Sequence, residues 1–216
     1  MTIQPHSRGS ANSCYMRLMK TYSKQEIARR QLGTALHLFL EDSDPISIHC
    51  LACGGAELAD WLARESGETT FSQHALNSDP AMAPTELLSL RNRYWNAMKH
   101  ATTRGGKSRD DENVLSTFED DDNDHTLFIG WYDYASAVGI LPIEAQVFQA
   151  WYFAKFPEKL ASAISPEPYD ELFPEIRKMD RPRRKMQLRA KIEWARHQAD
   201  VMQDPRTDLR PLILPG

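Results

Sequence analysis

The apolar residues of this chain recur at the spacing of an α-helix. Between residues 27 and 40 they fall three or four positions apart, which places them on one face of a helix. A second stripe of the same kind runs from residue 48 to residue 62. No segment shows the repeated apolar and polar alternation expected of several strands. The pattern predicts an all-α protein with about five helices and essentially no sheet in residues 23–160.

Helix-start and helix-stop residues bound these segments. Ser23 and Glu26 have the spacing of a capping box, in which both side chains bind free amide groups at a helix start. Asp44 supplies a capping carboxylate, and Pro45 follows at the first helical position. Gly55 lies inside the second helix, next to another glycine, at a cost of roughly 1 kcal/mol each, so another helix is expected to approach closely there. The predicted helices span residues 23–41, 45–67, 84–102, 120–139 and 142–157, and residues 67–84 are predicted to form a loop.

The length of 216 residues is sufficient for one packed core. We divide the chain into a loose arm (1–22), a helical bundle (23–164), and a proline-rich linker with a basic helix and tail (165–216). It has no run of about 18 uncharged apolar residues and no apolar stretch typical of a signal peptide, so no membrane contact and a cytoplasmic location are expected. The predicted core residues are Leu36, Phe39, Leu51, Leu58, Leu62, Leu87, Tyr94, Met98, Phe128, Phe148 and Trp151.

Charge is unevenly distributed along the chain. The net charge of −4 argues against a surface that binds nucleic acid over its whole extent. Acidic residues concentrate in residues 110–124, whereas residues 177–191 are strongly basic. The two segments attract one another, serve different partners, or are two solvated helix faces. The third interpretation is the simplest expectation.

Two short motifs resemble metal sites but lack residues that such sites require. Cys50 and Cys53 have a two-residue gap, but a structural zinc site needs a second pair of ligands, and none is present. Both cysteines are therefore expected to be reduced packing residues inside a helix. Residues 120–124 resemble the start of a calcium loop, but His125 stands at the glycine position and Trp131 at the final glutamate position. We expect no metal and no cofactor.

Arg93, Asn96 and His100 carry the strongest chemical pattern. On one continuous helix they lie at positions i, i+3 and i+7, so they share a face. A guanidinium binds phosphate, an amide orients it, and a histidine moves protons near neutral pH. The alternative is an exposed polar face with a histidine near the negative end of the helix dipole.

This segment resembles the HEPN family of small helical bundles, which includes metal-independent ribonucleases and inactive binding modules. The family ribonucleases have an arginine and a histidine separated by four to six residues, and six residues separate Arg93 from His100. Residues 95–100 also resemble the recurring Arg-Asn-x-Leu-Lys-His form, with Trp95 in the arginine position. The resemblance extends over residues 23–160 and includes the Asn-x-x-Lys-His segment that ends at His100.

The resemblance implies a HEPN-like antiparallel helical bundle, commonly a homodimer in which two motifs face a shared cleft. We expect a non-catalytic interaction module that binds a protein, RNA or nucleotide partner, such as a cognate antitoxin. Arg91, Trp95 and Lys99 are the candidate binding residues.

The alternative function is a metal-independent ribonuclease. In it Arg93 binds the phosphate, Asn96 positions it, and His100 serves as general acid or base for attack by the adjacent ribose hydroxyl. These three are the candidate catalytic residues.

Overall fold

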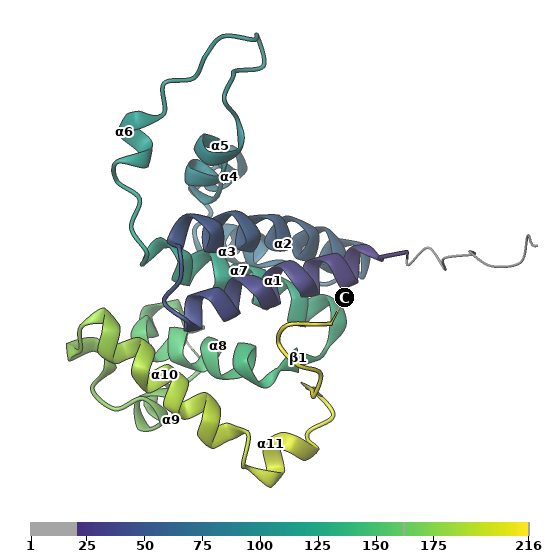
Figure 1. The fold of residues 1–216 in the computed structure, drawn as a ribbon, viewed down its shortest axis with the longest axis vertical. Coiled ribbons are helices and arrows are strands. Elements are labelled where there is room, and N and C mark those ends of the chain that lie inside the picture. The colour runs from purple at the N-terminus through teal and green to yellow at the C-terminus, as the bar shows by residue number, and fades with distance from the viewer. Residues whose placement is uncertain (1–20, 162, 216) are drawn as a thin grey trace, which may run out of the picture.

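The computed structural model describes residues 21–161 and 163–215, and its regular secondary structure is almost entirely helical (Figure 1). The all-α prediction is confirmed, whereas the expectation for residues 1–20 lies outside the described residues. None of the described helices combines the length and the apolar character needed to cross a bilayer. The helices are α1 (Lys24–Leu40), α2 (Pro45–Glu65), α3 (Phe71–Ser78), α4 (Pro84–Arg91), α5 (Arg93–Lys99), α6 (Glu112–Leu115), α7 (Asp122–Val138), α8 (Ile143–Lys155), α9 (Glu167–Leu172), α10 (Arg181–Ala195) and α11 (Ala199–Gln203).

The centre of the fold is the packing of α1, α2 and α7 (Figure 1). Leu32 of α1 lies between two glycines, one on each of the other helices. A Cβ on Gly55 would lie 2.7 Å from Leu32 Cγ, and a Cβ on Gly130 would lie 2.5 Å from Leu32 Cδ2. These distances are too short for a side chain, so glycine permits the close approach that the sequence predicts at residue 55.

The predicted core is confirmed for the large side chains of α1, α7 and α8. Phe39, Phe128, Phe148 and Trp151 are all buried, as is Leu36. Three predicted leucines of α2 are partly buried against this core: Leu51, Leu58 and Leu62. Three further residues were wrongly assigned to the core, because α4 and α5 lie outside the bundle and leave them half-buried: Leu87, Tyr94 and Met98.

The C-terminal residues complete the same core. Phe173, Ile176, Leu188 and Leu212 are buried together with the residues of α1, α7 and α8. The segment predicted as a proline-rich linker contains α9, and two-residue strands β1 (Leu141–Pro142) and β2 (Thr207–Asp208) pair in parallel beside α8. The tail is thereby held against the bundle.

The acidic and basic segments bind each other. Arg181 of α10 contacts Asp120 through Nε at 2.6 Å and Asp124 through Nη1 at 3.1 Å. Lys185 reaches Asp42 at 2.6 Å and is buried. Lys155 of α8 lies 2.6 Å from Asp124, which is fully buried. The expectation of two solvated helix faces is wrong for these residues, because the pairs lie between packed helices.

Two predicted boundaries require correction. The helix predicted over residues 84–102 is two helices, because Asn92 leaves helical geometry at φ −102° and ψ 12°. The loop predicted over residues 67–84 contains α3. Its start is a capping box: Thr70 Oγ1 accepts from the Gln73 amide at 3.3 Å, and Gln73 Oε1 accepts from the Thr70 amide at 2.7 Å. With α6, these changes give eight helices in residues 23–160 instead of about five.

Candidate functional site

Residues 92–121, which we call the projection, leave the bundle and return to it (Figure 1). The projection contains α5, a glycine turn and α6. Tyr94 anchors its two arms to each other, since its hydroxyl donates to the Thr117 carbonyl at 3.0 Å. The Tyr94 and Phe118 rings both pack edge-on against His49 of α2. The segment with the strongest sequence pattern therefore stands outside the core and is tied to it at its base.

Trp95 and Lys99, two predicted binding residues, both contact Glu57 of α2. The Trp95 indole Nε1 donates to Glu57 Oε1 at 2.8 Å, and Lys99 Nζ lies 3.8 Å from the same oxygen. Lys99 Nζ also lies 4.9 Å from the centre of the Trp95 ring. The structure brings these two residues together on the α2 side of α5, where they fix the position of that helix.

Arg91, the third predicted binding residue, joins α4 to three other helices. Its Nη1 lies 3.3 Å from Asp60 Oδ1 and 2.6 Å from Ser72 Oγ, and its Nη2 lies 3.9 Å from Asp133 Oδ2. Burial raises the pKa of Asp133 to about 6, an effect that the hydrogen bond from the Phe71 amide and the charge of Arg91 only partly offset. The Arg91 guanidinium is thus occupied within the chain.

The three candidate catalytic residues are not joined to one another by hydrogen bonds. Arg93 Nη2 donates to Thr117 Oγ1 at 3.1 Å, and its guanidinium lies 5.2 Å from the centre of the Tyr94 ring. α5 ends at Lys99, so His100 is exposed in extended backbone at φ −120°. Within the described part of the chain, the side chains of Asn96 and His100 have no hydrogen-bond partner. The helix therefore ends one residue before His100, so His100 does not occupy the helical position i+7 that was expected from the sequence.

Positive charge is concentrated in one arm of the projection, residues 92–109, whereas the other arm, residues 110–121, contains six Asp or Glu residues. Residues 91–109 include six Lys or Arg residues together with His100, and they contain no Asp or Glu. Arg93, Arg104 and Lys107 are exposed, and no acidic side chain among the described residues pairs with them. The turn that carries Arg104 and Lys107 is closed by the Thr103 amide, which donates to the Lys107 carbonyl at 2.8 Å. Arg104 and Lys107 were not identified from the sequence, although the absence of Asp and Glu from residues 91–109 could be seen there.

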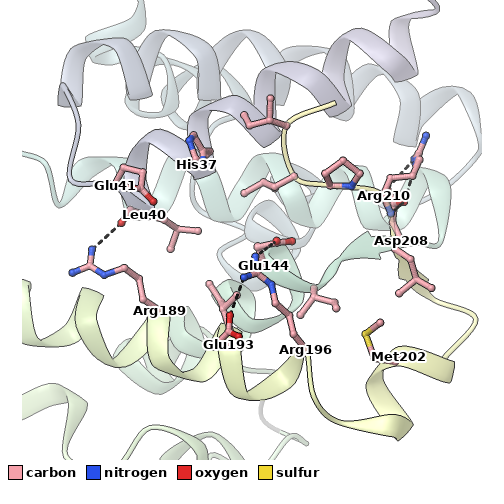
Figure 2. Close-up of a pocket in the computed structure, with 16 residues that line it drawn as sticks. His37, Leu40, Glu41, Glu144, Arg189, Glu193, Arg196, Met202, Asp208 and Arg210 are labelled. Carbon is pink, nitrogen blue, oxygen red and sulfur yellow. Dashed lines mark hydrogen bonds and ion pairs between the residues drawn. The ribbon is translucent and has the colours of Figure 1, made fainter. Parts of the chain in front are cut away.

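A groove of about 730 Å³ lies on the other side of α1, between α10, α11 and the C-terminal tail (Figure 2). Its arginines are already paired within the chain. Arg196 binds Glu144 at 2.6 Å, Arg189 binds Asp42 at 2.8 Å, and Arg210 binds Asp208 at 2.8 Å. Because its cations are balanced by nearby carboxylates, the groove is a weaker anion site than the projection.

A smaller pocket of about 160 Å³ lies at the base of the projection, between α2, α4, α5 and α7. Its wall includes His49, Arg91, Tyr94, Asp122 and His125. Burial lowers the pKa of His49, although the hydrogen bond to Asn123 opposes this effect. His49 is therefore neutral near pH 7 and can act as a hydrogen-bond acceptor through one ring nitrogen.

Two of the three cysteines lie on α2, where Cys53 is buried and Cys50 is half-buried, and Cys14 lies outside the described residues. Burial raises the pKa of Cys53 to about 12, so its thiol is protonated near neutral pH. Among the described residues, no three or more His, Cys, Asp or Glu side chains form a group that could hold a metal ion.

Comparisons of the chain with protein-family models, curated proteins and solved structures found no match. The HEPN resemblance stays a prediction carried by residues 23–160.

Proposed function

We propose that this chain is a HEPN-like, non-catalytic interaction module whose projection binds single-stranded RNA in the cytoplasm. The observation that carries this proposal is the set of three exposed cations, Arg93, Arg104 and Lys107, without acidic partners among the described residues. Lys and Arg side chains of this kind bind phosphate and release counterions, which favours association with a polyanion. The half-buried Tyr94 adds a ring on which a base can stack.

The charge distribution favours one RNA-binding face over general adhesion. The chain as a whole is negative, at −4, so its remaining surface repels a polyanion. Three basic side chains of α10, Arg181, Lys185 and Arg189, are held by Asp42 and the residues near Asp120. Arg183, Arg184 and Lys191 of the same helix have no acidic partner among the described residues. Within the projection, a polyanion is expected at residues 92–109, which contain no Asp or Glu.

Removing the two cations at the tip is expected to weaken RNA binding by roughly tenfold and to lower the salt dependence of binding. The variant is Arg104→Ala with Lys107→Ala, measured by fluorescence anisotropy with a labelled single-stranded RNA at several salt concentrations. The slope of log K against log salt should fall by about 0.7 for each phosphate that the variant no longer neutralises.

The matched control removes two other exposed cations, Lys159 and Arg183, which lie outside the projection and have no acidic partner among the described residues. It changes the net charge by the same amount. Equal weakening by both double variants would contradict a localised site and indicate attraction by overall charge alone.

A metal-independent ribonuclease is the second candidate function. The observation in its favour is His100, whose exposed ring has no hydrogen-bond partner among the described residues and is free to meet an RNA held by Arg93. The interaction-module proposal predicts no chelator-resistant cleavage of single-stranded RNA and no effect of His100→Ala. A ribonuclease would instead lose about two to four orders of magnitude in rate with that substitution. Cleavage products with a cyclic phosphate, absent in the variant, would establish the second function and contradict the first.

We also propose that the chain forms a homodimer. The family resemblance supports pairing, and α4 exposes Leu88 and Leu90 at 57% and 59% of their surface. Light scattering at micromolar concentration should give twice the 24.7 kDa chain mass, and Leu88→Glu should shift the mass toward that of one chain. A wild-type mass of one chain would contradict the dimer.

A further inference from the structure

A buried carboxylate on α7 joins α3 and α4 to the bundle. Asp133 is 0% exposed, and its Oδ1 accepts from the Phe71 amide, at the start of α3, at 2.7 Å. Its Oδ2 is closed off from solvent and has no hydrogen-bond partner among the described residues. Arg91, at the end of α4, places its Nη2 3.9 Å from that oxygen, which is too far for a hydrogen bond. The negative charge of Asp133 is therefore only partly compensated.

The other charged groups around Asp133 do not supply the missing compensation. Arg91 is shared with a second carboxylate, since its Nη1 lies 3.3 Å from Asp60 Oδ1, and it also donates to Ser72 Oγ at 2.6 Å. Arg64 of α2 is paired with Asp60 as well. Two carboxylates thus share two guanidiniums, and both guanidiniums bind the less buried carboxylate more closely.

Burial with incomplete compensation favours the protonated form of Asp133. An ionised carboxylate loses its hydration in a protein interior, and a second carboxylate nearby disfavours the charged form further. Burial raises the pKa of Asp133 from its ordinary value of 3.8 to about 6, and the charge of Asp60 acts in the same direction. Where water reaches the carboxyl group, its pKa returns toward the ordinary value.

The segment that covers Asp133 is held loosely. Among the described residues, no side chain of α3 or α4 is fully buried, and segments with few buried contacts open locally at low cost. The Phe71 ring packs edge-on against Phe128 and Tyr132 and provides the aromatic contact of α3 with the core. Because the two partners of Asp133 lie on α3 and α4, release of these helices leaves the carboxyl group open to water.

We propose that residues 71–91, which we call the latch, close more tightly on α7 in acid and open more readily as the pH rises toward neutrality. The sign follows from proton linkage, because between about pH 4 and pH 6 the closed latch keeps a proton on Asp133 that the open latch does not. The equilibrium constant for opening therefore rises over this range and becomes constant above it. Opening frees Arg91, next to the start of the projection. This inference does not depend on RNA binding.

The first test measures amide hydrogen exchange of the latch in the wild-type protein at pH 5 and pH 7.5, corrected for the intrinsic exchange rate at each pH. The opening constant should be about tenfold larger at pH 7.5, as linkage gives for a pKa of about 6 when closed and 3.8 when open. Latch amides should also exchange faster than the buried amides of α1, since their opening is local. An opening constant that does not rise with pH, or latch amides as slow as those of α1, would overturn the proposal.

The second test uses Asp133→Asn, which cannot titrate but keeps an oxygen that can accept from the Phe71 amide. Its opening constant should differ by less than about twofold between the two pH values. The matched control is His74→Gln on α3, because the His74 ring lies 5.8 Å from the Tyr132 ring and histidines gain protons near neutral pH. This control should keep the tenfold change.

A pH dependence that survives in folded Asp133→Asn protein, or that disappears in His74→Gln, contradicts the assignment to Asp133. If Asp133→Asn does not fold, the carboxyl ¹³C resonance of Asp133 is titrated by NMR in the wild-type protein. A midpoint near pH 6 supports the latch, and a midpoint below about pH 5, close to that of an ordinary aspartate, overturns it.

Discussion

Arg29→Met is expected to lower the free energy of unfolding by about 3–5 kcal/mol, because it leaves the buried Asp208 carboxylate with only the more exposed Arg210 as partner and removes the donor of two carbonyl groups of the tail. Arg29 is 1% exposed, and its Nε lies 3.1 Å from Asp208 Oδ2. The guanidinium also donates to the Leu212 carbonyl at 3.0 Å and to the Pro211 carbonyl at 3.2 Å. One side chain of α1 therefore satisfies three acceptors of the C-terminal tail. Denaturant unfolding followed by circular dichroism measures the loss.

Arg30→Met is the matched control for this prediction. Arg30 also binds the tail, at the Leu214 carbonyl (3.1 Å) and the Pro215 carbonyl (2.8 Å), but its side chain is 24% exposed. Water can replace these bonds, so a loss below about 1 kcal/mol is expected. If Arg29→Met costs no more than this control, the tail is not part of the cooperative core. Limited proteolysis would then be expected to remove residues near Leu212 from the folded variant.

The long helices could be predicted from sequence because their signals are local. The stripe from residue 27 to residue 40 and the capping residues Ser23 and Asp44 lie within one or two turns of the helices they define. Gly139 likewise ends α7 in left-handed backbone, with φ 77°, as its position after the apolar stripe predicts. α3 could have been predicted in the same way, since Thr70 and Gln73 have capping-box spacing.

The break at Asn92 could not be predicted, because neither proline nor glycine marks it. Asn92 lies between Arg91, which is held by Asp60, and Trp95, which is held by Glu57. Both partners are on α2 and more than thirty positions away in sequence. Contacts over that distance leave no periodic pattern in the chain, so the local signal for one continuous helix was misleading.

The candidate site could be predicted only in part for the same reason. The basic and aromatic residues of the projection were visible in sequence, and so was the excess of charge in residues 110–124 and 177–191. The partly compensated charge of Asp133 was not, because it depends on Phe71, 62 positions away, and on Arg91. No residue type or spacing in the sequence encodes these contacts.

Asp124→Asn is expected to lower the free energy of unfolding by about 1–3 kcal/mol, because Lys155 and Arg181 lose a buried hydrogen-bond acceptor and keep only the more exposed Asp120 and Asp121 as partners. Asp124 is fully buried and lies 2.6 Å from Lys155 Nζ and 3.1 Å from Arg181 Nη1. An amide of the same shape removes the negative charge between two cations, and the Lys155 side chain is only 6% exposed. Water therefore cannot replace the missing carboxylate. Thermal and denaturant unfolding of the variant, each compared with wild type, measure the effect.

Asp121→Asn is the control that distinguishes the effect of burial from the effect of removing one negative charge. Asp121 contacts the same two cations as Asp124, Lys155 and Arg181. It lies 3.1 Å from Lys155 and is paired with Arg181, but it is 46% exposed. Solvent screens these pairs, so the expected loss is below about 1 kcal/mol. High salt should weaken the small contribution of Asp121 further and leave that of Asp124 nearly unchanged, since buried pairs are screened much less. Equal losses for the two variants would show that the join between α7 and α10 depends on total charge and not on the buried carboxylate of Asp124.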